Sequence, residues 1–183
     1  MGLFHALVFS LIGFSNTSVA SISTDSIMQF ASQTYLDGNL HLSHAQALQV
    51  DCMAKVIFFE ARGESKRGKT LVANVVRNRT EFGKPFATEL CKVVYQPNQF
   101  AWTRDARKKH ILFKQIAVKY GKNEQKAVLE SVEIALDYVL FQPKSITKAT
   151  HFCSKGEKCS FKRTEFLGKV GNHSFYLYKG NAS

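Results

Sequence analysis

The sequence predicts a mostly helical α+β domain that ends in a small β hairpin or sheet. Apolar residues recur at helical spacing in four segments, which are 43–64, 66–80, 105–120 and 123–143. A β-rich composition appears only later, at 149–152 and 174–178. A chain of 183 residues can bury one core without cross-links, so we expect a single domain over residues 43–183.

The first twenty residues have the features of a signal peptide. Leu3 to Phe14 is an apolar run too short to span a bilayer, and Ser18-Val19-Ala20 has the small-x-small form of a cleavage site. We therefore expect export to the periplasm or the exterior, without stable membrane insertion. Because no Lys or Arg precedes the apolar run, a short uncleaved anchor is the alternative. Residues 21–42 are polar, and we interpret them as a leader onto the domain.

Positive charge dominates the composition and indicates a polyanionic partner. Lys and Arg number 25 against 14 Asp and Glu, a formal net charge of +11. Nucleic acid, an anionic membrane surface and an acidic cell-wall polymer all fit such a charge. Export and the lack of a nucleic-acid-binding motif argue against the first of these.

The segment 43–64 is the most apolar helix of the chain and carries one unusual carboxylate. Ser43 and Gln46 form a capping box, and Gly63 is the expected end. At about 100° per residue, Asp51, Lys55 and Arg62 share one stripe, which we expect to face water.

Glu60 projects roughly opposite that stripe, where an ionised carboxylate is costly unless it is paired or lies in a cleft. One interpretation is a salt bridge to a neighbouring Arg. The adjacent Phe58 and Phe59 and the nearby Gly63 favour a cleft acid at least as strongly.

Two further segments contain candidate binding residues. Asn78 ends the 66–80 helix, either as a hydrogen-bonded helix-end residue, which we favour, or as a polar group in the cleft. Val93 to Tyr95 is a short strand or a helical turn, and Pro97-Asn98 is a loop. Aromatic rings alternating with amides suit a sugar-binding groove, and this stretch offers Tyr95, Gln99, Phe100 and Trp102. Packing in the core explains Phe100 and Trp102 almost as well.

The four cysteines predict two disulfides in an exported protein. Of the three connectivities, we favour Cys52–Cys91 and Cys153–Cys159. A zinc site formed by His151, Cys153, Cys159 and His173 ranks well below, because the spacing fits no standard finger.

The remaining segments are interpreted as scaffold. Asp105 is the expected N-cap of a helix that ends at Gly121, and Asn123 is expected to cap the next helix, up to Pro143. His151 begins the first β segment, where it either lines the groove or makes a structural hydrogen bond.

Several motifs together resemble the SleB/CwlJ-type cell wall hydrolases. The motifs are Glu60-Ala61-Arg62-Gly63-Glu64, Gly68, the run from Val72 to Arg79, and Cys91 to Trp102, so the resemblance is closest over 48–102. Ala149 to Phe152 and Gly171 to Tyr176 look like two C-terminal landmarks of the family. Between them, a Cys-bounded, Lys-rich loop replaces the usual Pro/Trp-containing segment.

The resemblance implies a lysozyme-like domain that acts on peptidoglycan glycan strands, and we favour a lytic transglycosylase. Glu60 would be its catalytic acid, with a pKa raised by burial beside aromatic rings. The same carboxylate would then act as the base that activates the C6 hydroxyl of the muramyl residue.

A hydrolase of the same bond needs a second carboxylate, for which Glu64 and Asp105 are the candidates. We instead expect Glu64 to pair with Arg67 or Lys66, and Asp105 to cap a helix. A hypothesis of another class is a non-catalytic cationic wall-binding module. We expect a monomer with no cofactor and no metal.

Overall fold

The computed structural model describes residues 23–180 and confirms the predicted mostly helical α+β class. The predicted signal peptide and its cleavage site lie outside the described residues. Within that range, no helix is long and apolar enough to cross a membrane. The helices are α1 Thr24–Leu36, α2 His44–Ala61, α3 Lys66–Phe82, α4 Leu90–Val94, α5 Ala106–His110 and α6 Phe113–Leu136. The strands are β1 His151–Ser154, β2 Thr164–Val170 and β3 His173–Tyr178.

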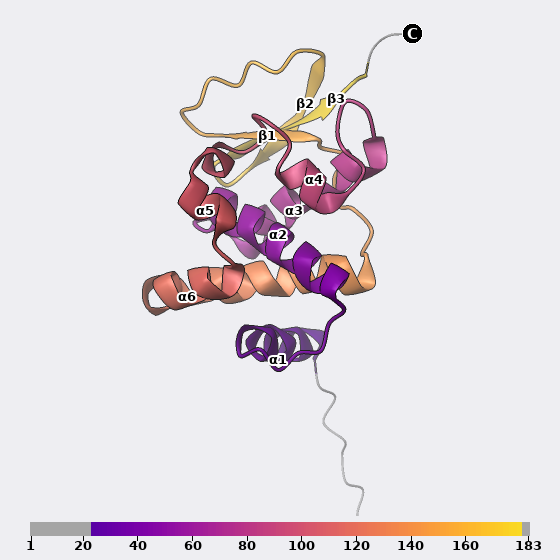
Figure 1. Cartoon of the computed structure of the whole chain (residues 1–183). Coiled ribbons are helices and arrows are strands. Elements are labelled where there is room, and N and C mark those ends of the chain that lie inside the picture. The colour runs from indigo at the N-terminus through magenta and orange to yellow at the C-terminus, as the bar shows by residue number, and fades with distance from the viewer. Residues whose placement is uncertain (1–22, 181–183) are drawn as a thin grey trace, which may run out of the picture.

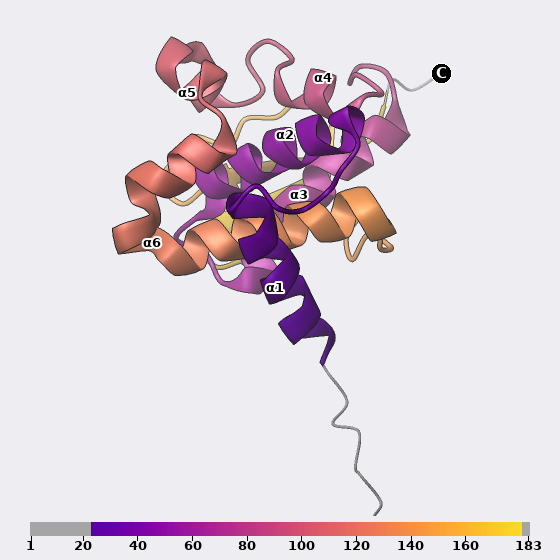
Figure 2. The ribbon, with the colours of Figure 1, turned by 60° about the horizontal axis from the view of Figure 1, so that its bottom comes forward.

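Helix α2 is the centre of the helical part, between α6 on one side and α3 and α4 on the others (Figures 1 and 2). Its apolar residues fill the main core, and Val50, Met53, Val56 and Ile57 are fully buried. The predicted capping box is confirmed, because the Ser43 side chain accepts from the Gln46 N–H and the Gln46 side chain accepts from the Ser43 N–H.

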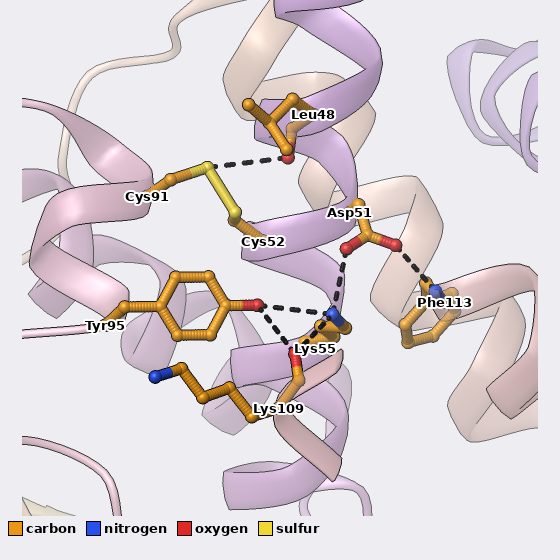
Figure 3. Close-up of a disulfide and its surroundings, with 8 residues drawn as sticks. All are labelled: Leu48, Asp51, Cys52, Lys55, Cys91, Tyr95, Lys109 and Phe113. Atoms are coloured by element: carbon orange, nitrogen blue, oxygen red, sulfur yellow. Dashed lines mark hydrogen bonds and ion pairs between the residues drawn. A yellow bond between two sulfur atoms is a disulfide. The ribbon is translucent and has the colours of Figure 1, made fainter. Parts of the chain in front are cut away.

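The prediction that Asp51 and Lys55 face water is wrong. Lys55 is 2 % exposed, and its Nζ lies 3.1 Å from Asp51 and donates to the hydroxyl of Tyr95 and the carbonyl of Lys109 (Figure 3). The Asp51 carboxylate also accepts from the Phe113 N–H at 2.6 Å. The polar partners of this stripe come from Tyr95 after α4, Lys109 in α5 and Phe113 at the start of α6, which the periodicity of α2 alone does not reveal.

The segment expected as a polar leader contains α1. Ser23 caps this helix by accepting from the Ser26 N–H, and Tyr35 is buried. Helix α1 packs against α6 on the side of the molecule opposite the sheet (Figure 1). Its sparse apolar residues still recur at helical spacing, and this narrow stripe is enough to dock it.

The two helices expected between Asp105 and Pro143 are divided differently. Asp105 does cap a helix, α5, but that helix ends at His110. Helix α6 begins at Phe113 and continues past Gly121, with a kink at Glu124, where φ is −128° and ψ is 29°. Its last turn passes into a π-helical turn, Asp137–Phe141. The kink at Glu124 separates two helical halves of α6 and lies one residue after Asn123, so it corresponds to the boundary predicted between Gly121 and Asn123. Val93 and Val94 lie in a helical turn, α4, rather than in a strand.

The expected C-terminal sheet is present and has three antiparallel strands in the order β1-β3-β2. β1 and β3 pair with His151 opposite Tyr176, and β2, which we did not predict, pairs with β3 through an irregularity near Gly168. The sheet packs on α3 through a small second core of Leu71, Val75, Ala149 and Phe175.

Both favoured disulfides, Cys52–Cys91 and Cys153–Cys159, are formed. The first ties α2 to α4 (Figure 3), and the second closes the loop that follows β1. The zinc hypothesis fails because both of its sulfurs are bonded to each other. Residues 23–180 also contain no other His, Cys, Asp and Glu cluster suited to a metal ion.

Candidate functional site

Glu60 lies in the last turn of α2 as a half-buried carboxyl group without a bonding partner. It makes no hydrogen bond or ion pair with any described residue, so the salt bridge to an Arg, one of the two interpretations of the sequence, is not formed. Burial raises its pKa to about 7, the negative charge of Glu157 adds to this increase, and the positive charge of Arg79 opposes it. An acid with this pKa is partly protonated at neutral pH and can both donate and accept a proton.

Arg79 is a buried cation whose charge reaches Glu60, and the sequence analysis assigned it no role. It is 4 % exposed, and its Nε donates to the Thr150 carbonyl at 2.7 Å. Its guanidinium carbon lies 5.2 Å and 5.4 Å from the ring centroids of Phe86 and Phe100. Nη1 is buried and has no hydrogen-bond partner in the described part of the chain. The signal in the sequence was an Arg directly after Asn78, at the end of an otherwise apolar helix face.

Glu64 is held in place by the turn between β2 and β3. Its side chain is 7 % exposed, and the Asn172 N–H lies 3.2 Å and 3.3 Å from its two carboxylate oxygens. His173 Nδ1 is 3.9 Å away. The prediction that Glu64 pairs with Arg67 or Lys66 is therefore wrong, because the sheet folds back over this end of α2.

Asp105 is occupied as the N-cap of α5, where it accepts from the Arg107 N–H at 3.0 Å. A different carboxylate, Glu157, has the negative charge that acts on Glu60. Its Oε2 accepts from the Ser154 N–H at 3.0 Å, inside the loop closed by Cys153–Cys159. Sequence spacing alone did not indicate that this loop lies near α2.

The predicted groove aromatics are mostly packed inside the fold. Phe100 is 3 % and Trp102 is 6 % exposed. The Trp102 ring centroid lies 5.0 Å from that of Phe59, next to Glu60 in sequence, and 6.0 Å from that of Tyr95. These rings form the apolar wall beside the last turn of α2.

Asn78 is the hydrogen-bonded helix-end residue that we favoured. Its amide nitrogen donates to the carbonyls of Thr147 and Ala149, at 2.8 Å each, and its oxygen accepts from the Ser145 hydroxyl at 2.7 Å. It thereby fixes the segment leading into β1 against α3.

Gln99 and His151, two of the predicted binding residues, line the same open hollow. Burial and the positive charge of Arg79 lower the pKa of His151 to about 4, so its ring is neutral at neutral pH. A larger hollow of about 550 Å³ lies between α2 and α4 near Leu48 and Glu89, but neither Glu60 nor Arg79 lines it. We therefore place the chemistry at the end of α2 nearest the sheet.

Comparison with known proteins identifies the family. The family described as Cell Wall Hydrolase matches residues 63–176, which is more than half of the chain. The chain belongs to this cell wall hydrolase family, and this membership indicates an enzyme that degrades peptidoglycan. The matched range includes Arg79, Gln99 and His151 and begins three residues after Glu60. No curated protein and no solved structure matched the chain. Family membership and the two disulfides fit an exported protein.

Proposed function

We propose that the protein cleaves the MurNAc–GlcNAc glycosidic bond of peptidoglycan as a lytic transglycosylase, with Glu60 as both acid and base. The observation that carries this proposal is the unpaired, half-buried Glu60 carboxyl, whose pKa is about 7. A single group near neutrality can serve in both proton transfers of the reaction.

In the first step, protonated Glu60 donates its proton to the glycosidic oxygen as the bond to the muramyl anomeric carbon breaks. The carboxylate left behind is stabilised by the positive charge of Arg79. In the second step, that carboxylate removes the proton from the C6 hydroxyl as its oxygen bonds to the anomeric carbon. The product is a 1,6-anhydro ring, Glu60 is protonated again, and no water is consumed.

Transglycosylation is favoured over hydrolysis because the two candidates for a second carboxylate, Glu64 and Asp105, are engaged elsewhere. Glu64 accepts from the Asn172 backbone, and Asp105 caps α5. Intramolecular capture benefits from effective molarity and needs no base for water. If water is the nucleophile, Glu157 is the carboxylate to test first, since its charge acts on Glu60.

We also propose how the remaining predicted residues divide their roles in a lysozyme-like groove. Gln99 and His151 line open space and would contact the substrate. The other four are packed or hydrogen-bonded, and would support the wall of the groove: Asn78, Tyr95, Phe100 and Trp102.

Zymography on purified peptidoglycan tests the acid. Glu60→Gln should reduce clearing by roughly 100-fold or more while the fold survives, since positioned acid–base catalysis contributes about that much. Glu81→Gln, on an exposed carboxylate of α3, is the matched control and should clear like the wild type. A Glu60→Gln protein that clears normally would refute the assignment, and a wild type that binds without clearing would indicate a wall-binding module.

Mass spectrometry of the digest separates the two reactions. A transglycosylase yields 1,6-anhydromuramyl ends, which are one water lighter than reducing ends and are inert to borohydride. Exclusively reducible muramic ends would show that water is the nucleophile.

Export and assembly complete the proposal. We propose cleavage after Ala20, so that the mature chain starts at Ser21 and is a monomer. Intact mass of the exported protein and its size in solution test these two points. A full-length mass with membrane retention would indicate an uncleaved anchor.

A further inference from the structure

A small open hollow lies near Arg79, the buried cation whose charge acts on Glu60. It is a hollow of about 280 Å³, here called the side hollow, lined in part by Phe86, Gln99, His151, Ser160, Phe161 and Lys162. Glu60 does not line it. Phe86 connects the two places, because its ring lines the side hollow and also lies 5.2 Å from the Arg79 guanidinium carbon. The volume is just below the range of about 300–1,000 Å³ typical of ligand pockets, so it suits a small group.

The neighbours of His151 fix the proton on its ring. The Thr150 hydroxyl accepts from the Tyr178 N–H at 2.8 Å and lies 3.1 Å from His151 Nδ1. Thr150 is 1 % exposed, and its hydroxyl hydrogen would lose its partner if Nδ1 carried the proton. Nδ1 is therefore the acceptor, and the neutral ring carries its hydrogen on Nε2, which makes Nε2 a donor.

The polar groups of the side hollow that remain free are mainly donors. Neither the Gln99 amide nor the Lys162 ammonium group has a partner among residues 23–180, and Ser160 adds a hydroxyl. Gln96 also lines the hollow, but its amide is occupied by the Pro85 carbonyl and the Ala87 N–H. None of the described lining residues is Asp or Glu.

This pattern distinguishes among the chemical parts of peptidoglycan. Sugar hydroxyls are both donors and acceptors, whereas an ionised carboxylate only accepts. A hollow with an ammonium group, a ring N–H and an amide, but no carboxylate, is complementary to a carboxylate. Phe86 and Phe161 flank the His151 ring, at centroid distances of 5.6 Å and 4.8 Å, and offer apolar surface to an aliphatic chain.

We propose that the side hollow binds the carboxylate-bearing peptide branch of the substrate, with Lys162 and the Nε2–H of His151 as its donors. This inference rests on the proposed function, because it assumes that the glycan strand lies along the last turn of α2. A peptide branch leaves a glycan strand sideways, so a small site separated by the Phe86 ring from Arg79, whose charge acts on Glu60, has a suitable position. Ser160 to Lys162 directly follow the disulfide-closed loop, where this chain departs from the family pattern.

Binding rather than turnover tests the side hollow. The Glu60→Gln protein is titrated with a disaccharide-peptide carrying free carboxylates, with the same compound amidated at those carboxylates, and with the bare disaccharide. We expect the free acid to bind about fivefold to tenfold more tightly than either other ligand, as one charge-assisted contact would give. Adding Lys162→Gln should remove most of this preference.

Lys158→Gln is the matched control, because Lys158 is exposed, follows β1 in the same region and does not line the side hollow. It should keep the full preference for the free acid. Equal affinities for the three ligands, or an undiminished preference in Lys162→Gln, would overturn the proposal. Since Lys162 is exposed, a circular dichroism melt should match the parent protein.

The same titration separates this inference from the proposed function. If the wild type clears peptidoglycan but the three ligands bind equally, the side hollow is wrong and the enzyme assignment stands. If the preference is seen and is lost in Lys162→Gln, the side hollow is supported even where the wild type gives no clearing. That second result would describe a module that recognises peptide-bearing wall.

Discussion

The backbone N–H of Asn172 lies 3.2 Å and 3.3 Å from the two carboxylate oxygens of Glu64 and so connects residues 108 positions apart. This contact anchors the turn between β2 and β3 to the turn that follows α2, one helical turn beyond Glu60. Gly171 sits directly against the same carboxylate, with φ at +57°. The position of the sheet relative to the acid therefore depends on a small set of close contacts.

Gly171→Ala should destabilise the protein by about 2 kcal/mol or more. An added Cβ would collide with the Glu64 carboxylate, and a positive φ is unfavourable for a residue with a side chain. Urea unfolding measures the change. Gly121→Ala is the control, because it has open space around it and lies in α6, so it should be neutral or slightly stabilising. Equal effects of the two substitutions would contradict this account.

Glu60→Gln should stabilise the fold at alkaline pH. The folded-state pKa of about 7 lies above the ordinary 4.5, so the folded chain binds the proton more tightly than the unfolded chain. Wild-type stability therefore falls as pH rises from about 4.5 through 7, and the neutral Gln variant does not share this loss. The full difference corresponds to at most about 3 kcal/mol.

Unfolding curves at pH 4 and pH 8 test the sign of this effect. The stability of Glu60→Gln relative to the wild type should rise between the two values. Glu81→Gln, at an exposed carboxylate of α3, provides the comparison. A relative stability of Glu60→Gln that falls with rising pH would show that the carboxyl is stabilised in its charged form.

The two disulfides should contribute unequally to stability. Cys52–Cys91 spans 39 positions and Cys153–Cys159 only 6, and chain-entropy arguments give the longer loop the larger effect, about 4 against about 2 kcal/mol. Replacing each pair by Ala and measuring the free energy of unfolding checks the order. Thiol counting in denaturant without reductant should find almost no free thiol in the exported protein, and four free thiols would contradict the pairing.

Much of the fold could be predicted because burial imposes periodicity on the sequence. The apolar positions of α2, the capping box at Ser43 and the β composition near His151 are local signals, and each was confirmed. The environment of Asp51 and Lys55 was not predictable in this way, because their partners come from Tyr95, Lys109 and Phe113. Polar residues on one face of a helix indicate that this face is exposed to solvent, unless another segment of the chain covers the face and supplies hydrogen bonds.

In the candidate site too, the features with a local sequence signal were predicted and those that depend on tertiary contacts were not. Glu60 stood out because a carboxylate on an apolar helix face is costly, and its raised pKa agrees with that reasoning. Arg79 and Glu157 were missed because their relation to Glu60 is tertiary, across α3 and the disulfide-closed loop. Likewise, the sequence suggested that Glu64 pairs with nearby cations, because it does not show that Asn172 and His173 of the sheet lie against this carboxylate.

The role of Arg79 gives the sharpest test of the proposed mechanism. Its positive charge lowers the pKa of Glu60, while burial and the charge of Glu157 raise it. Arg79→Gln should therefore move the pKa of Glu60 upward, and the pH above which activity falls should rise with it, because the acid must be protonated to donate. The maximal rate should decrease about tenfold, since the carboxylate formed in the first step loses its stabilising charge.

Two variants separate this electrostatic role from a structural one. Arg79→Lys keeps the charge, so its alkaline limit should stay near that of the wild type even if the lost bond to Thr150 reduces stability. Arg77→Gln removes an equal charge from the same helix, at a residue that pairs with Glu81 and donates to the Pro143 carbonyl, and it should leave the limit unmoved. His151, whose pKa Arg79 also lowers, remains neutral at alkaline pH in every variant, so the alkaline limit reports Glu60 alone. An unmoved limit in Arg79→Gln, or an equal shift in Arg77→Gln, would show that Arg79 supports the fold without tuning the acid.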